Sequence, residues 1–333
     1  MTDPTDRRNF LKIAGASLGF GALYRVAPQL AAGAEGTDLS KLLGRKNVER
    51  PTPFSFVQLS DSHVGFNGPP NPLGTRAFER AVDMINGLPE RPELVLFTGD
   101  LTHDSENPAE HAARMRLFQK IAGRLRVPAI KCVPGEHDAG LDGGALFRDA
   151  FGDSSYSFDH RGVHFIALDN VSQGAPDRRR RAAFLAEEGP RALPDDRPIV
   201  VFTHRPLFDL RPDWEWFTGD GDEVVNALAP HENVTVLYGH IHRENVHRDG
   251  HATHYAARSL IFAFPDPASG VPKKPLPFDK EQPFKNLGLR VVKESGGKPG
   301  STPRPGIEEV ELTLREFSGT VGIQQLLKAG VTS

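Results

Sequence analysis

The chain has 333 residues, of which 40 are lysine or arginine, 43 are aspartate or glutamate and 38% are hydrophobic. This length and hydrophobic content exclude a disordered chain and allow one large core or two smaller ones. The net charge of −3 and the single cysteine argue against a broad nucleic-acid-binding surface, an internal disulfide and a multi-cysteine metal site.

The first 34 residues have the layout of an export signal. A charged start with Arg7-Arg8 precedes a short apolar stretch over 13–24, and small residues follow at 32–34. The paired arginines before Phe10-Leu11-Lys12 resemble a twin-arginine signal, which implies the twin-arginine export machinery as a partner. We therefore expect residues 1–34 to be removed, residues 35–50 to form a linker, and the mature protein to be periplasmic or secreted without a stable membrane anchor.

Short apolar strands alternate with helical segments along the rest of the chain. Strands are predicted at 54–59, 94–97, 128–133, 199–202 and 234–238, with a hairpin at 156–159 and 163–168 and late strands at 287–292 and 307–314. Helices are predicted at 75–86, 109–125 and 177–188. A proline-rich stretch over 265–283 interrupts the pattern. The alternation indicates an α/β protein.

Polar clusters follow the carboxyl ends of five predicted strands. They are Asp61-Ser62-His63, Gly99-Asp100, Gly135-Glu136-His137-Asp138, Thr203-His204 and Gly239-His240-Ile241-His242. In α/β sheets this edge is where binding and catalytic residues gather, because the strands are rigid and the loops beyond them vary freely. We expect the five clusters to converge on one site.

The donor atoms of these clusters favour a pair of metal ions. The candidate ligands are Asp61, His63, Asp100, Glu136, His204, His240 and His242. Mixed oxygen and nitrogen donors without a thiolate suit Mn, Fe, Zn, Co or Ni better than Ca or Cu(I). Seven donors exceed a single shell that must keep a position open for water, whereas two ions that share one carboxylate would use them well.

The five clusters resemble the motifs of the calcineurin-like metallophosphoesterase family. That family has D-x-H, G-D-x-x, G-N-H-[DE], a later His and G-H-x-H, and the match covers about residues 54–264. A looser similarity is to secreted cyclic-nucleotide phosphodiesterases. The resemblance implies a four-layer αββα sandwich of two mixed sheets, an α/β (α+β) fold. It would comprise a catalytic domain over 51–264, completed by a proline-rich loop and late strands over 265–333.

The resemblance also implies a role for each motif residue. The first metal would be held by Asp61, His63 and His242, the second by Glu136, His204 and His240, and Asp100 would bridge the two. His137 would stabilise the transition state or protonate the leaving oxygen, and Asp138 would orient its imidazole. The implied enzyme is a hydrolase of phosphate esters, favoured as a phosphodiesterase, in which a metal-bridging hydroxide attacks phosphorus in line.

Glu136 departs from the family pattern, which has Asn at this position. An ionised Glu136 cancels the net positive charge of the expected centre, and a neutral centre attracts a dianionic monoester less well. This charge predicts either a preference for monoanionic diesters or one Fe³⁺ ion in a pair otherwise drawn from Mn, Fe and Zn.

Two other functions are compatible with the same residues. A periplasmic metal-binding or partner-binding protein could keep the metal ligands and have reduced or lost phosphoesterase activity through Glu136. An iron pair bound by histidines and carboxylates could instead serve redox chemistry. His137 favours hydrolysis, because an imidazole beside the metals that binds none of them has no use in storage.

Several neighbouring residues have two interpretations. Arg205 follows His204 and could hold a phosphate oxygen of the substrate or form a loop salt bridge. Trp214 and Trp216 could cover the site, although packing of their own loop is the favoured interpretation. His103 is expected to have a structural or outer role.

Overall fold

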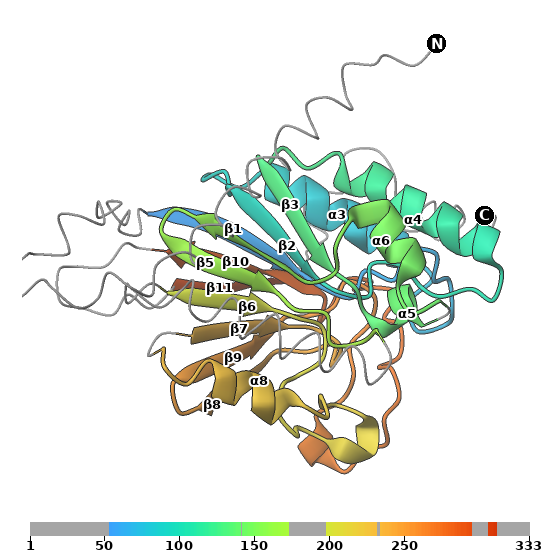
Figure 1. Cartoon of the computed structure of the whole chain (residues 1–333). Helices are drawn as coiled ribbons and strands as arrows, with labels where there is room; N and C mark the ends of the chain where they lie inside the picture. The colour runs from blue at the N-terminus through green and yellow to red at the C-terminus, as the bar shows by residue number, and fades with distance from the viewer. Residues whose placement is uncertain (1–52, 141, 173–197, 232–233, 295–305, 312–333) are drawn as a thin grey trace, which may run out of the picture. The chain divides into compact units, whose positions relative to one another are not determined.

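The computed structural model describes residues 53–140, 142–172, 198–231, 234–294 and 306–311 (Figure 1). These residues belong to one compact unit that spans 48–333. The predicted signal and linker over 1–50, the helix predicted at 177–188 and the end of the last predicted strand lie outside the described residues. None of the helices in the described ranges is both long enough and apolar enough to cross a bilayer.

The first sheet has five strands in the order β11-β10-β1-β2-β3. Their bounds are β1 Phe54–Leu59, β2 Leu94–Thr98, β3 Ala129–Val133, β10 Gly288–Glu294 and β11 Gly306–Glu311. Strands β1, β2 and β3 are parallel, whereas β10 runs antiparallel to both β1 and β11. The two late strands therefore belong to the same sheet as the first strand of the described chain.

The second sheet has six strands in the order β4-β5-β6-β7-β9-β8. Their bounds are β4 Tyr156–His160, β5 Val163–Ala167, β6 Ile199–Phe202, β7 Val234–Tyr238, β8 Asn245–Asp249 and β9 Ala252–Ala256. Strands β5, β6, β7 and β9 are parallel, and antiparallel hairpins add β4 and β8 at the edges. Both sheets are thus mixed, as predicted.

Helices cover the outer face of each sheet (Figure 1). The helices are α3 Gly74–Asn86, α4 Pro108–Ala122, α5 Glu136–Ala139, α6 Ala145–Phe151 and α8 Gly221–Ala227, with short 3₁₀ turns η2 Pro212–Trp214 and η3 Pro267–Ser269. Helices α3 and α4 pack on the first sheet, and α8 packs on the second. The layers follow in the order helix, sheet, sheet, helix, which confirms the predicted sandwich.

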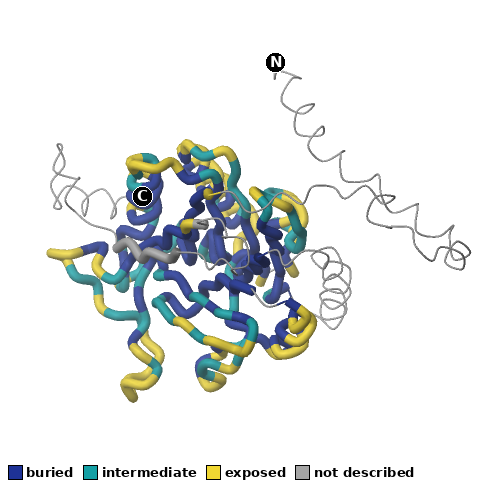
Figure 2. Tube along the Cα trace, turned by 90° about the vertical axis from the view of Figure 1, so that its left-hand side faces the viewer, coloured by how far each residue is buried: buried dark blue, intermediate teal, exposed yellow. Residues whose placement is uncertain are grey.

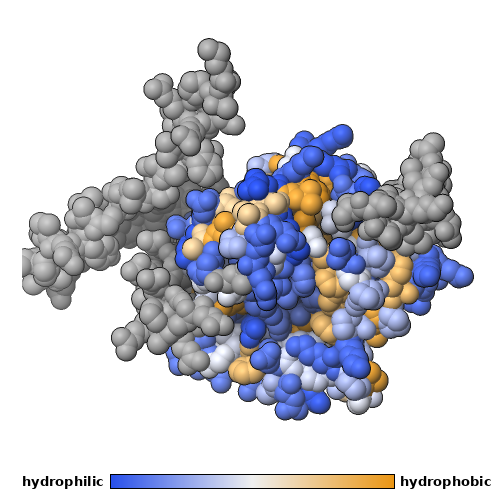
Figure 3. All heavy atoms as spheres, turned by 90° about the vertical axis from the view of Figure 1, so that its right-hand side faces the viewer, coloured by the Kyte–Doolittle hydropathy of each residue, from blue (hydrophilic) through white to orange (hydrophobic). Residues whose placement is uncertain are grey.

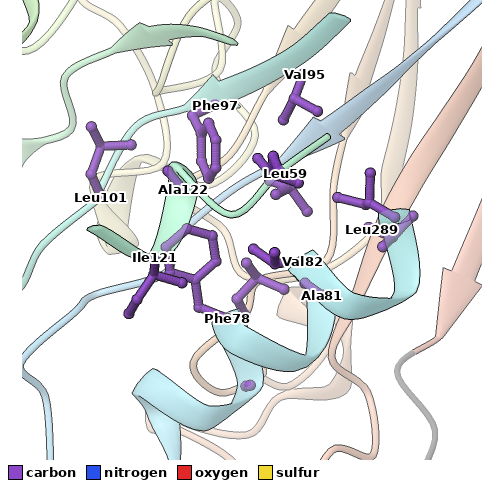
Figure 4. Packing of buried hydrophobic residues seen from close by; sticks show 14 of the residues in the cluster. Leu59, Phe78, Ala81, Val82, Val95, Phe97, Leu101, Ile121, Ala122 and Leu289 are labelled. Carbon is purple, nitrogen blue, oxygen red and sulfur yellow. The ribbon is translucent and has the colours of Figure 1, made fainter. Parts of the chain in front are cut away.

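The side chains of β1 point alternately to the two faces of its sheet, and so the strand contacts two layers. Val57 and Leu59 face helix α3, whereas Phe54 and Phe56 face the second sheet. Side chains of a strand point alternately to its two faces, so a strand buried on both sides is apolar at nearly every position. Figure 4 shows the helix side, where Phe78 of α3 lies against the sheet. Figure 2 shows the resulting buried centre and the exposed loops around it.

Helix α4 begins at a polar cap that its sequence encodes. The side-chain oxygen of Asn107 accepts a hydrogen bond from the Ala109 backbone N–H at 3.0 Å, and Pro108 occupies the first turn. Asparagine at the cap and proline just inside it are preferred because they satisfy or remove donors that lack a helical partner. The helix therefore starts a few residues after the loop that carries Asp100.

Candidate metal centre

The predicted ligands converge because both sheets end on the same side. Asp61 and His63 follow β1, Asp100 follows β2 and Glu136 begins α5 directly after β3. His204 follows β6, and His240 and His242 follow β7 of the second sheet. These five strands are parallel within their sheets, so their carboxyl ends bring loops of both sheets together (Figure 1).

The first group of candidate ligands gathers four side chains. Donor atoms of Asp61, His63, Asp100 and His242 all lie within 4.8 Å of one another. The His63 Nε2 atom is 3.3 Å from His242 Nε2, and His242 Nε2 is 3.4 Å from Asp61 Oδ1. All four residues are buried. We call these residues the first group.

The second group contains Glu136, His204 and His240, again with donor atoms within 4.8 Å. Glu136 Oε2 is 2.9 Å from His204 Nε2, and Glu136 Oε1 is 2.6 Å from His240 Nδ1. Both carboxylate oxygens of Glu136 therefore face an imidazole nitrogen. A side chain placed in this way offers an anionic oxygen to each of the two imidazoles.

Asp100 lies between the two groups. Its Oδ2 atom is 3.4 Å from His63 Nε2 and also 3.4 Å from His204 Nε2. Its other oxygen, Oδ1, accepts a hydrogen bond from the His137 backbone N–H at 3.0 Å. One carboxylate oxygen is thus fixed by the backbone, and the other faces both groups.

Each of the four histidines has its outer ring nitrogen held. Nδ1 of His204 donates to the Thr98 carbonyl at 2.7 Å, and Nδ1 of His242 donates to the Phe262 carbonyl at 2.9 Å. His240 uses Nε2 toward the Glu215 carbonyl at 3.3 Å, and His63 Nδ1 meets His103 Nδ1 at 3.3 Å. In a neutral imidazole, a ring nitrogen that donates to a carbonyl leaves the opposite nitrogen unprotonated, which is how ligating imidazoles are oriented when a metal is bound. The carboxylates and imidazoles present therefore fit metal ions.

The backbone at the ligands is strained. Five of the seven candidates have positive φ angles, namely Asp61 (53°), His63 (39°), Asp100 (50°), His240 (65°) and His242 (54°). Residues other than glycine rarely adopt this left-handed conformation, which costs of order 1–3 kcal/mol each and persists at functional sites. Gly239 precedes His240 and has a steric role, because a Cβ atom at this position would collide with Ser60 and Asp61.

The acids and imidazoles of the site shift one another's proton affinity. Burial alone would raise the pKa of Asp100, but His204 and its neighbours lower the pKa to about 2. Burial acts in the same way on Glu136, yet His240 and His204 hold its pKa well below the usual range. The pKa of His204 lies well above its ordinary value because Asp100 and Glu136 outweigh the effect of burial. The carboxylates are therefore ionised and ready to bind cations.

Asp138 does not have the expected position. We predicted that it orients His137, but its carboxylate accepts hydrogen bonds from the backbone N–H groups of Leu101, Thr102 and Gly135, each at 2.9 Å. The reason is geometric: the two side chains are successive on the single turn of α5, and successive helical side chains point about 100° apart. Asp138 instead ties the loop after β2 to the loop after β3.

Asp104 contacts His137 instead. His137 Nδ1 lies 2.6 Å from Asp104 Oδ1. Burial lowers the pKa of His137, but the charges of Asp100 and Asp104 more than compensate and raise it above the ordinary value. The sequence interpretation missed Asp104, whose only signal is an acid four positions after Asp100.

Arg205 lies at the edge of the second group. Its Nε is 3.5 Å from Glu136 Oε2, and both side chains are half-buried. The side-chain oxygen of Asn170 accepts from the backbone N–H groups of His204 and Arg205, at 3.2 Å each, and so fixes the turn that presents them. Trp216 is fully buried and Trp214 nearly so, which confirms that they pack their own loop.

Comparison with known proteins agrees with this fold. The model of the calcineurin-like phosphoesterase family matches residues 54–244. A probable cyclic nucleotide phosphodiesterase of Rhodopseudomonas palustris is 32% identical over 215 residues, which are 57% of this chain and 72% of the relative. A serine/threonine-protein phosphatase of Bos taurus is 27% identical over 243 residues, or 63% of this chain and 76% of that protein.

A solved structure shares the architecture. The dimetal phosphatase from Danio rerio superposes with a TM-score of 0.53 at 14% identity, covering 79% of this chain and all of that one. The chain belongs to the calcineurin-like phosphoesterase family, and it is a phosphoesterase with candidate metal-binding clusters at the sheet edge.

Proposed function

We propose that the protein hydrolyses phosphate esters with two divalent cations, one in each group of ligands, and that it is a phosphodiesterase. The observation that carries the proposal is the position of Asp100, whose Oδ2 atom is 3.4 Å from one imidazole of each group. A single carboxylate shared between two ligand sets is what a pair of ions needs. When bound, the ions would supply an activated water near neutral pH and neutralise charge on the phosphoryl oxygens.

His137 is the proposed proton donor to the leaving group. Its Nδ1 faces Asp104, so its Nε2 is the atom that can carry the transferable proton. In the reaction the water would lose one proton to solvent on activation and its oxygen would bond to phosphorus; the ester P–O bond breaks, the leaving oxygen takes the proton from His137, and the ring is reprotonated from solvent. Asp104 positions the ring and favours its charged form, which is the form that donates.

Arg205 is the proposed partner of a phosphate oxygen. Its guanidinium is half-buried beside Glu136, so it reaches the second group from the solvent side. A planar fork of N–H donors binds a phosphate bidentately, and the contact with Glu136 restricts where the fork points. The two interpretations from the sequence, a substrate contact and a loop salt bridge, are thus compatible in one geometry.

Glu136 supports a preference for diesters. Two divalent ions with two aspartates and a hydroxide carry one net positive charge, and an ionised Glu136 reduces it to zero. At such a neutral centre, a monoanionic diester loses less electrostatic attraction than a dianionic monoester does. The similarity to a probable cyclic nucleotide phosphodiesterase supports the same choice. One Fe³⁺ ion, with Mn, Fe or Zn as the other metal, would restore the positive charge and weaken the preference.

Turnover of bis(p-nitrophenyl) phosphate by the manganese-loaded protein tests the proposal. We expect hydrolysis in the wild type and a loss of about 10²–10⁴-fold in kcat for His137→Ala with unchanged metal content. His247→Ala, which replaces a histidine on β8, is the matched control and should retain the wild-type rate. Metal binding without hydrolysis of any ester would favour a metal-binding or partner-binding protein, and oxygen consumption would favour redox chemistry.

The charge argument has its own test. Elemental analysis and the diester-to-monoester rate ratio are measured for the wild type and Glu136→Asn. We expect the substitution to lower the ratio in a protein with two divalent ions. An unchanged ratio together with unchanged iron content would show that the charge of Glu136 does not select the substrate.

We further propose export of the protein by the twin-arginine route to the periplasm or the medium. The support is the arrangement of Arg7-Arg8, the apolar stretch and the small residues within the first 34 positions. Arg7→Lys combined with Arg8→Lys should retain the uncleaved chain inside the cell, as measured by fractionation and mass spectrometry. A double variant that is still cleaved and exported would contradict the proposal.

A further inference from the structure

Half-buried aromatic rings line one side of the first group. The ring centroid of Phe262 is 4.8 Å from that of His242 and 6.2 Å from that of His63, nearly parallel to the latter. Phe66 packs edge-to-face on Phe262 at 5.5 Å and on His103 at 5.0 Å. Neither phenylalanine is fully covered by the described residues. We call Phe66, Phe262 and His103 the aromatic rim.

The rim is held in place before any ligand arrives. The Phe262 carbonyl accepts from His242 Nδ1 at 2.9 Å and from Ser259 Oγ at 2.5 Å. The Phe66 N–H donates to the His63 carbonyl at 2.9 Å. Gly68 gives the Phe66 ring room, since a Cβ atom at that position would meet its tip. A rigid apolar surface binds a flat partner without a large loss of conformational freedom.

The rim continues to the proposed proton donor. His137 stacks on His103 with centroids 4.8 Å apart and an interplanar angle of 26°. The row therefore runs from His137 through His103 and Phe66 to Phe262. A group attached to the oxygen that receives the proton from His137 would lie over these rings.

Charge disfavours an anionic group at this position. Arg205, the cation expected to bind the phosphate, lies beside Glu136 of the second group. Arg114, which contacts the backbone of His103, is engaged by Glu110 and by the carbonyl oxygens of His103 and Asp104. Asp104 adds a negative charge beside His137. On the side of the molecule at which the strands end, hydrophobic and hydrophilic surface lie next to each other (Figure 3).

We propose that the aromatic rim is a subsite for a flat, uncharged aromatic ring in the leaving alcohol of the phosphate ester. This inference rests on the proposed function and deepens it by naming the class of leaving group. A nucleobase and a simple aryl group share the required chemistry, because both offer a π face to Phe66 and Phe262. The alternative is that the rings only shield the first group from water.

Two phosphinates that have no ester bond separate these possibilities. Dimethylphosphinate and methyl(phenyl)phosphinate carry the same anionic centre, and only the second has a ring. Calorimetric titration of the manganese-loaded wild type should give about tenfold tighter binding of the phenyl compound. Phe66→Leu and Phe262→Leu, which keep apolar bulk without a ring, should each lose most of that preference and leave dimethylphosphinate binding unchanged.

Phe208→Leu is the control, since Phe208 is a half-buried ring that stacks on His247 elsewhere in the molecule. It should keep the full preference. Equal binding of the two phosphinates by the wild type, or a preference retained in both rim variants while bis(p-nitrophenyl) phosphate is hydrolysed, would overturn the subsite. Absence of binding together with absence of hydrolysis would overturn the proposed function, and this inference with it.

Discussion

At the scale of single residues, the site depends on contacts between loops that are distant in the sequence. Asp104 and Asp138 are both acids near His137, one at a separation of 33 positions and one adjacent to it. Only the distant one contacts the imidazole. The residue types and their order after each strand predict the candidate ligands, whereas which acid meets His137 depends on loop geometry that no local pattern encodes.

Asp104 is therefore expected to matter through His137. Asp104→Asn should lower kcat by roughly 10–100-fold because the ring loses its orienting charge, as happens when a carboxylate that holds a histidine is removed. KM and metal content should stay near the wild-type values. Asp149→Asn, which changes an exposed acid on α6, is the matched control. Steady-state kinetics with elemental analysis checks the result, and a wild-type kcat in Asp104→Asn would show that His137 needs no partner.

At the scale of elements, apolar runs predict the strands and helices that enter the core. Strands β1, β2 and β3 and helix α3 were all predicted within about two residues, because each has an apolar or amphipathic signature. The β8–β9 hairpin was missed because β8 reads Asn-Val-His-Arg-Asp, without a continuous apolar face. The pairing of β10 with β1 was out of reach, since strand register depends on partners more than 200 positions apart.

Helix α3 should stabilise the first sheet chiefly through Phe78. That ring is fully buried and stacks on Phe118 at 5.2 Å and against Phe97 at 5.6 Å. Phe78→Ala should lower the free energy of unfolding by about 3–5 kcal/mol, because the transfer energy is lost and a cavity remains. Val271→Ala, at a half-exposed position, should change it by less than about 0.5 kcal/mol. Chemical denaturation measures both, and equal effects would contradict the assigned core.

Strand β9 contains a histidine that should make stability depend on pH. His254 is fully buried, and burial lowers its pKa to about 4. Between about pH 6.5 and 4, His254 is protonated in the unfolded chain but stays neutral in the folded chain. The free energy of unfolding is therefore highest above about pH 6.5 and falls as the pH drops toward 4. His254→Leu should remove up to roughly 3 kcal/mol of that decline. If the unfolding free energies of the wild type and His254→Leu fell equally with pH over this range, His254 would not be the source of the pH dependence.

At the scale of the whole molecule, the site joins the two sheets. The first group draws ligands from β1 and β2 of one sheet and from β7 of the other, and the second group likewise combines β3 with β6 and β7. Ions at this junction would bind the folded chain in preference to the unfolded one, because only folding brings these loops together. The order of the motifs allowed this convergence to be predicted, but the strained backbone that achieves it was visible only in the structure.

Metal removal should therefore lower the melting temperature. A cation at 100 times its dissociation constant stabilises the folded state by about 2.7 kcal/mol. Dialysis against a chelator should lower Tm by several degrees, and manganese should restore it, as followed by calorimetry. Asp100→Asn should respond less to both treatments because it loses the shared carboxylate. Equal changes in Tm for the wild type and the variant would show that the stabilising ions bind at a site other than the two groups.

Anomalous X-ray diffraction from manganese-loaded crystals tests most directly whether two ions bind with Asp100 between them. Two peaks are expected, one within each group of ligands, with the Oδ2 atom of Asp100 between them. A single peak, or peaks that lie away from these side chains, would contradict a shared carboxylate at a pair of ions.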